Sequence, residues 1–215
     1  MPPLTIADLP FAEGDPAEVL CLDHADPDFT GAFFGFGRPL DDPAMLFMPG
    51  AVSGGWGGMV HMVADALGFA LDEKKISKHE VSVATKPIDS PIGPIEPGLV
   101  AAQRFTWQAT VRGVPVMTVR TNWFMGEEHL DPAWTFGPEG QRFEVEVTGD
   151  PTAHLTFHGW HPESIQAGLV RNPGIVATAI HGVSAIPYVC RAPAGIQTYL
   201  DLPLYAGRAA AELAK

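Results

Sequence analysis

The sequence predicts an α+β fold, with an open, mixed and mostly antiparallel β-sheet and helices packed on one face. Two observations predict it: strand patterns follow one another in pairs joined by short turns, and helical patterns are few and widely separated. Antiparallel strands with helices segregated to one face are typical of this class. We expect the 215 residues to form one domain, with residues 1–16 as an extended arm and residues 204–215 as a tail helix.

Charge and composition exclude several classes of partner. The formal net charge of -12 argues against nucleic acid and anionic membrane surfaces, which attract basic proteins. No apolar run has the length of a membrane span and the first residues do not resemble a signal peptide, so we expect a cytoplasmic protein. Cys21 and Cys190 do not form a disulfide framework, and we expect both to be buried thiols.

Elements of the first half of the chain follow from apolar pattern and from glycine and proline positions. They are a strand over 17–23, an aromatic and glycine-rich turn region over 29–43, a helix over 59–67, and a strand over 75–86 that ends in a proline-rich loop over 87–98. Gly68 suits the position after the last helical residue, because glycine readily adopts the left-handed conformation found there.

The clearest local signal is a β-hairpin. Two extended runs, 99–111 and 114–125, are separated only by Arg112 and Gly113. A two-residue loop that ends in glycine is typical of a tight hairpin turn. A second strand pair, 142–149 with 153–160, is expected to turn at Asp150-Pro151.

The end of the chain is predicted to contain a helix and a short strand. Asn172 suits an N-cap and Pro173 the first helical position, so we expect a helix through Ile186. A strand over 196–202 and the alanine-rich tail helix should follow.

Uninterrupted pairing outward from the hairpin turn would place aromatic and polar side chains on one sheet face. Val111 would lie opposite Val114, and the pairs further out would be Trp107 with Thr118, Phe105 with Arg120, and Gln103 with Asn122. Residues directly opposite one another share a face. An apolar wall with a few polar groups could form a small-molecule pocket, although the same pattern also fits a face that covers helices, with Arg120 and Gln103 at the rim.

The segment SGGWGG, residues 53–58, raises the question of a phosphate-binding loop, since glycines before a helix often hold phosphates. The preceding residues contain two prolines and fit a central strand poorly, so we expect a lead-in to the helix, with Trp56 beside a pocket wall. Its glycines would allow close approach of the chain to the sheet or to a ligand. His61 and Asp65 share a helix face and form either an exposed ion pair or a pair that faces a partner or a cavity.

Metal and nucleophile chemistry receive little support. His154, His158 and His161 lie close in sequence, but residues four apart on a strand are about 13 Å apart, too far for one ion. His79 alternates with valines and is expected to be a half-buried structural residue, while Glu80 and Lys86 lie on a solvated face. No nucleophile elbow and no Walker motif occur.

The residues 173–203, PGIVATAIHGVSAIPYVCRAPAGIQTYLDLP, closely resemble the C-terminal segment of dihydrodipicolinate-reductase-like oxidoreductases, in particular the 2,4-diaminopentanoate dehydrogenase and native amine dehydrogenase group. The matching positions are Thr178, His181, Ala185, Ile186, Pro187, Pro193, Gly195, Ile196, Asp201, Leu202 and Pro203. Ser184 stands where the family has asparagine, and Ala194 where it has a second proline. The segments 35–39, 62–73 and 98–116 also resemble that family's substrate domain.

The resemblance implies the substrate and oligomerisation domain of enzymes whose Rossmann domain binds NAD(P). We expect the chain to lack that domain and to hold no cofactor or metal of its own, and we expect a homodimer. Three functions follow as alternatives. The domain could act without nicotinamide on a hydrophobic carbonyl or amine compound, as an isomerase, cyclase or lyase. It could be the substrate subunit of a split oxidoreductase completed by a separate Rossmann protein. It could also be a non-catalytic module that binds a small molecule or a protein.

The expected site residues combine the hairpin face with both helices. The candidate catalytic residues are Arg120, His181 and Asn122, and the candidate substrate-binding residues are Trp107, Phe105, Gln103, Trp56 and His61.

Overall fold

The computed structural model describes most of the chain in segments: residues 6–10, 28–42, 44, 48, 53–74, 76–90, 92–135, 142–158 and 173–203. The chain forms two compact units, Met1–Asn172 and Pro173–Lys215, and each is described by itself. The expectation of a single domain remains a prediction.

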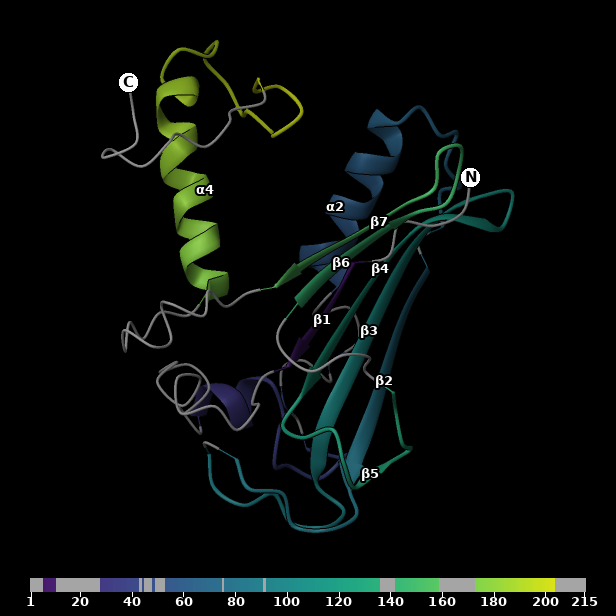
Figure 1. Cartoon of the computed structure of the whole chain (residues 1–215), viewed down its shortest axis with the longest axis vertical. Coiled ribbons are helices and arrows are strands. Elements are labelled where there is room, and N and C mark those ends of the chain that lie inside the picture. The colour runs from purple at the N-terminus through teal and green to yellow at the C-terminus, as the bar shows by residue number, and fades with distance from the viewer. Residues whose placement is uncertain are drawn as a thin grey trace. The chain divides into compact units, whose positions relative to one another are not determined.

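The first unit is built on a seven-stranded sheet in the order β5-β2-β3-β4-β1-β6-β7 (Figure 1). Its strands are β1 (Ile6–Pro10), β2 (Ile76–Ala84), β3 (Val100–Val111), β4 (Val114–Phe124), β5 (Leu130–Asp131), β6 (Arg142–Val147) and β7 (Ala153–His158). Neighbouring strands pair antiparallel except β1 and β4, which are parallel. This open, mixed sheet confirms the predicted α+β class. It also shows that five residues of the expected N-terminal arm form a strand between β4 and β6.

The predicted hairpin turn is confirmed. Val111 pairs with Val114 across Arg112 and Gly113, and both turn residues have positive φ, 51° and 77°. Positive φ at both central residues defines a type I′ turn, whose twist matches that of the flanking strands. β2 and the β6–β7 pair also form where their patterns predict them.

The register of the hairpin differs from the predicted one beyond the second pair. Thr110 pairs with Pro115 and the next residue, Ala109, pairs with Met117, so Val116 is the extra residue of a β-bulge. Proline has no N–H to donate to the ladder, which explains why regular pairing breaks here. Because strand side chains alternate between faces, this one-residue slip moves every later residue of β4 to the opposite face.

The helix α2 (Ser53–Ala66) begins six residues earlier than predicted and includes the whole SGGWGG segment. Its end is as predicted: Gly68 has φ of 81°, its N–H donates to the carbonyl of Asp65, and the N–H of Phe69 donates to that of Ala64. These two bonds are those of a Schellman cap, which satisfies carbonyls of the last turn.

The core lies between α2 and one face of the sheet. Val60 and Ala64 of α2 pack in one cluster with buried apolar side chains of β3 and β4, including Phe105, Trp107 and Val119. The π-helix η2 (Asp28–Phe33) and the turns after it occupy the region predicted as an aromatic turn, and Phe34 and Phe36 join the same cluster. Burial of these large side chains is the main stabilising term of the unit.

The described part of the second unit, residues 173–203, contains α4 (Pro173–Val189) and the turns that follow it. The helix starts at the predicted proline and continues past Ile186. The predicted strand over 196–202 is wrong: the Asp201 carboxylate accepts hydrogen bonds from the N–H and hydroxyl of Thr198, and these bonds hold a turn there. Cys190, expected to be buried, is exposed just after the helix. No helix in the described part of the chain is long and apolar enough to span a membrane.

Four predictions fall on residues outside those described: the strand over 17–23, the tail helix over 204–215, the buried thiol of Cys21 and the N-cap role of Asn172. They remain predictions.

Candidate functional site

A small pocket lies between α2 and the β2–β3 pair, with about 260 Å³ of empty space, part of it open to solvent. Its lining comes from three elements and consists of Gly57, Val60, His61, Ile76, Ser77, Trp107 and Gln108. Ile76 and Ser77 lie directly opposite Gln108 and Trp107 in the sheet, so adjacent strand pairs and one helix face form the walls. The part of this space that compares with an enclosed cavity is about 30 Å³, room for roughly two water molecules, so the pocket suits a small group such as the apolar end of a ligand.

Two of the predicted substrate-binding residues meet at this pocket. Trp107 of β3 is buried and His61 of α2 is half-buried, and both line it. The structure therefore places His61 at a cavity, while Asp65 on the same helix is exposed. Trp56 lies on the same helix, and its side chain is outside those described.

Two other predicted substrate-binding residues, Phe105 and Gln103, belong to the core and do not line the pocket. The ring of Phe105 stacks on that of His79, with centroids 4.2 Å apart, and on that of Trp107 at 5.9 Å. The fully buried Gln103 donates from its amide nitrogen to the carbonyl of Phe34 at 2.6 Å. These contacts position the wall that carries Trp107.

His79 makes structural contacts as predicted, but it is exposed on β2 rather than half-buried. Its Nε2 lies 3.0 Å from the side-chain oxygen of Gln103, which can only accept, so Nε2–H is the donor. Burial lowers the pKa of His79 below its ordinary value, and the hydrogen bond to Gln103 opposes that shift in part. This environment therefore favours the neutral form of the imidazole.

Arg120 and Asn122 lie on the face opposite the predicted one, which corrects the expected pocket face. Because of the bulge, Arg120 pairs with Thr106 and Asn122 with Arg104, whereas Phe105 and Trp107 pair with Thr121 and Val119. Arg120 is exposed, and Asn122 is buried. The two candidate catalytic residues and the aromatic wall therefore face opposite sides of the sheet.

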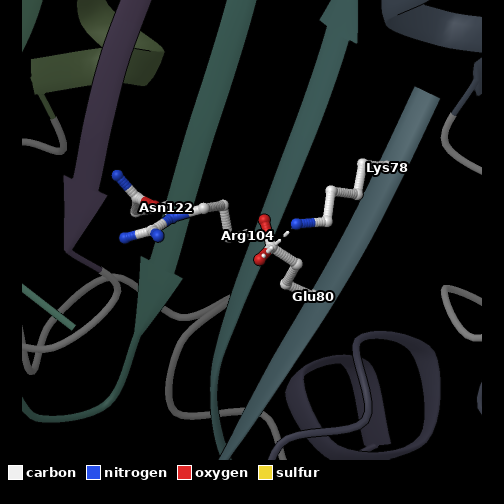
Figure 2. A network of polar contacts seen from close by, with 4 residues as sticks. All are labelled: Lys78, Glu80, Arg104 and Asn122. Carbon is white, nitrogen blue, oxygen red and sulfur yellow. Dashed lines mark hydrogen bonds and ion pairs between the residues drawn. The ribbon is translucent and has the colours of Figure 1, made fainter. Parts of the chain in front are cut away.

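This second face carries a polar network that crosses three strands (Figure 2). Arg104 Nε donates to Asn122 Oδ1 at 2.5 Å, and its guanidinium lies 4.5 Å from the ring centroid of Trp134. Lys78 and Glu80 form an ion pair of 2.7 Å, with the Lys78 side chain 64% exposed. Exposed pairs of this kind contribute little stability, in agreement with the predicted solvated face.

His181, the third candidate catalytic residue, belongs to the second unit. It is exposed on α4, and its ring centroid lies 4.7 Å from that of Tyr199. A joint catalytic role of His181 with Arg120 and Asn122 remains a prediction.

Within the described segments, no group of three or more His, Cys, Asp or Glu side chains could hold a metal ion. β7 is extended through His154 and His158, which are four residues apart and so separated by about 13 Å. His161 lies outside the described residues.

The SGGWGG segment is not a loop before its helix. A phosphate-binding glycine loop connects a strand to a helix. Here the segment forms the first turns of α2, from Ser53 onward. A Cβ at Gly57 or Gly58 would have no protein atom within 4 Å, so these two glycines do not serve a close approach to the sheet, and close approach to a ligand remains a prediction.

Several lining residues were not predicted from the sequence: Gly57, Val60, Ile76, Ser77 and Gln108. The β2–β3 register brings Ile76 and Ser77 beside the hairpin, and a single sequence gives no signal for that pairing. Gly57 did stand out, but as part of a glycine cluster that suggested phosphate binding.

Comparisons with known proteins agree with this fold. Residues 47–213 match the family model described as the 2,4-diaminopentanoate dehydrogenase C-terminal domain. An amine dehydrogenase of Streptomyces virginiae is 30% identical over 191 residues, which cover 84% of this chain and 49% of that protein. The fold matches the structure of an amine dehydrogenase from Mycobacterium smegmatis with a TM-score of 0.60 and 17% identity, over 95% of this chain and 52% of that one.

The chain thus spans about half the length of these relatives. The resemblance predicted from residues 173–203 is confirmed by the family model, which extends over both units of the structure. The chain therefore belongs to the family of 2,4-diaminopentanoate dehydrogenase C-terminal domains.

Proposed function

We propose that the chain is the substrate-binding domain of an amine-dehydrogenase-type oxidoreductase, and that it holds the apolar part of a small carbonyl or amine compound between α2 and β2–β3. Family membership supports the class of protein. The observation that carries the proposal is the pocket that joins His61 of α2 to Trp107 of β3, residues far apart in the sequence.

The lining suits a compound with a hydrocarbon part and one polar group. Trp107 and Val60 offer apolar surface, and an aromatic ring buries a large area against a flat or branched carbon skeleton. Ser77 and His61 can donate or accept hydrogen bonds, which suits either a carbonyl oxygen or an amine nitrogen.

An oxidoreductase role fits this pocket better than an isomerase, cyclase or lyase role. Those reactions move protons at two positions and use a general acid and a general base. Among the described lining residues His61 is the one titratable side chain. In a dehydrogenase the cofactor carries the hydride, so the substrate domain need only bind and orient the compound. A nicotinamide would then be held by a separate Rossmann-fold protein or domain.

Arg120, Asn122 and His181 have no assigned role in this pocket, because the first two lie on the other sheet face and the third is in the second unit. A non-catalytic binding module would use the same pocket without turnover.

Calorimetric titration with butan-2-one and butan-2-amine tests the proposal. We expect the protein to bind at least one of them, and Ser77→Leu, which fills the pocket, to weaken binding about 10-fold or more. Ser184→Leu is the matched control, since Ser184 is exposed on α4 and does not line the pocket. Absence of binding, or equal binding by Ser77→Leu, would contradict the proposal.

A second assay separates the classes of function. Conversion of the bound ketone only when NAD(P)H, ammonia and a Rossmann-fold partner are all added supports the oxidoreductase class. Conversion of a bound compound without any nicotinamide nucleotide would support the isomerase, cyclase or lyase class instead.

A further inference from the structure

We propose that Gly57 determines which small molecules the pocket admits, because its missing side chain leaves space that a methyl group would occupy. This inference rests on the proposed function of the same pocket. Gly57 is buried in α2 and lines the pocket.

Neither backbone conformation nor packing explains a glycine at this position. Gly57 lies within a regular helix, and it does not have the positive φ found at Gly68. A Cβ built on it would meet no atom within 4 Å. Glycine is a poor helix former, so the helix carries a destabilising residue here that its own geometry does not need.

The consequence of this glycine is therefore found in the pocket. Opposite α2 the pocket is bounded by Ser77 and Trp107, which are paired in the sheet and backed by the stacked Phe105. Trp107 and Phe105 belong to the packed core, although Ser77 is exposed, so the aromatic part of this wall resists displacement by a larger ligand. The width available to a ligand is thus set on the helix side, at Gly57 together with Val60.

Gly58 provides a matched control in the same helix. It is exposed, it does not line the pocket, and a Cβ there would also meet no atom within 4 Å. Alanine at either position gives the same gain in helix propensity and the same added methyl group. The two substitutions differ in one respect, which is whether the methyl enters the pocket.

The ligand pair is chosen to match that methyl. Butan-2-one and 3-methylbutan-2-one differ by one methyl on the carbon next to the carbonyl. One methyl or methylene in an apolar pocket changes binding about 10–200-fold when the site cannot relax.

The experiment measures the affinities of both ketones for the wild type, Gly57→Ala and Gly58→Ala by calorimetry, with circular dichroism to show that all three are folded. We expect Gly57→Ala to lose about 10-fold or more affinity for 3-methylbutan-2-one relative to butan-2-one, and Gly58→Ala to behave as the wild type. If Gly57→Ala keeps the wild-type preference, or if Gly58→Ala changes as much, the inference about Gly57 is wrong while the pocket stands. If the wild type binds neither ketone nor the corresponding amines, the proposed function fails and this inference with it.

Discussion

The imidazole of His79 donates a hydrogen bond of 3.0 Å to the side-chain oxygen of Gln103, two residues that lie on adjacent strands and 24 positions apart in the sequence. The Gln103 amide nitrogen in turn donates to the carbonyl of Phe34. This chain of hydrogen bonds connects β2 through the buried core to the aromatic turn after η2. It holds Phe105 in the stack that supports Trp107 at the pocket.

Replacing Gln103 with leucine should lower the free energy of unfolding. The substitution keeps the side-chain volume similar but leaves the Phe34 carbonyl and the His79 N–H without this partner. The bond to Phe34 is buried, and a buried unsatisfied group costs about 1–3 kcal/mol, whereas the exposed His79 can turn to water. Urea unfolding measures the loss. Gln108→Leu is the control: Gln108 is half-buried and donates to Thr118 Oγ1 at 3.1 Å, so about 1 kcal/mol or less is expected. Equal losses for the two variants would contradict the role given to Gln103.

His79 should make the protein less stable in mild acid. Burial lowers its pKa in the folded state below the ordinary value of 6.5, so between the two pKa values the unfolded chain binds more protons than the folded one. Stability therefore falls as the pH drops through 6.5, until the lowered folded-state pKa is reached. The midpoint of thermal unfolding at pH 7.5 and pH 5 measures this fall.

His79→Phe keeps a ring on Phe105 but cannot titrate, so its midpoint should fall less than that of the wild type over the same pH range. His154→Phe removes an exposed histidine of β7 and should retain the wild-type fall. If the thermal unfolding midpoint of His79→Phe falls as much as that of the wild type between pH 7.5 and pH 5, then groups other than His79 cause the fall.

Asp72 should stabilise the hairpin turn from outside the hairpin. Its carboxylate accepts hydrogen bonds from the N–H groups of Arg112 and Gly113 and from the hydroxyl of Thr110. These bonds, the Gly113 N–H first and the Thr110 hydroxyl next, lower the pKa of Asp72 below 3.8. The stabilisation is thus present above the ordinary carboxyl pKa and lost as the pH falls through the lowered one.

Asp72→Ala should have a lower thermal unfolding midpoint than the wild type at pH 7. Its midpoints at pH 7 and pH 3 should also differ less than those of the wild type. Asp65→Ala, which removes an exposed carboxylate of α2, should have little effect on either. If Asp72→Ala has the thermal unfolding midpoint of the wild type at pH 7, the turn does not depend on the hydrogen bonds to Asp72.

We propose that the chain forms a homodimer, as the family resemblance implies. The second unit exposes large apolar side chains, which a second copy can cover: Val183, Ile186, Val189, Ile196, Tyr199 and Leu200. Light scattering should give twice the mass of the chain. Val183→Asp should shift the distribution toward the monomer, and Ser184→Asp, beside it on α4 and also exposed, should shift it less. A monomeric wild type would contradict the proposal.

Features set by neighbouring residues could be predicted from the sequence. Arg112-Gly113 specifies its turn because Gly113 adopts positive φ without steric cost, and Gly68 ends α2 for the same reason. The strand pairs and the start of α4 at Pro173 follow from local pattern in the same way.

The candidate site could be predicted only in part, because it depends on which side of the sheet each residue faces. The bulge at Val116 reverses that side for all of β4 beyond it, and so separates Arg120 and Asn122 from Trp107. The start of α2 was predicted too late because glycine is disfavoured within helices, yet the SGGWGG segment lies in this one. Trp107 and His61 could be found because an aromatic strand face and a polar residue on an apolar helix are visible without knowing the register.

The most direct test of the pocket is a crystal structure of the protein with butan-2-one or butan-2-amine, whichever binds more tightly in the calorimetric titration. We expect ligand density between α2 and β2–β3, with the carbon skeleton on Trp107 beside Gly57 and the polar atom toward Ser77 or His61. Density in another part of the protein, such as the face of Arg104 and Asn122, with this pocket unchanged would contradict this expectation.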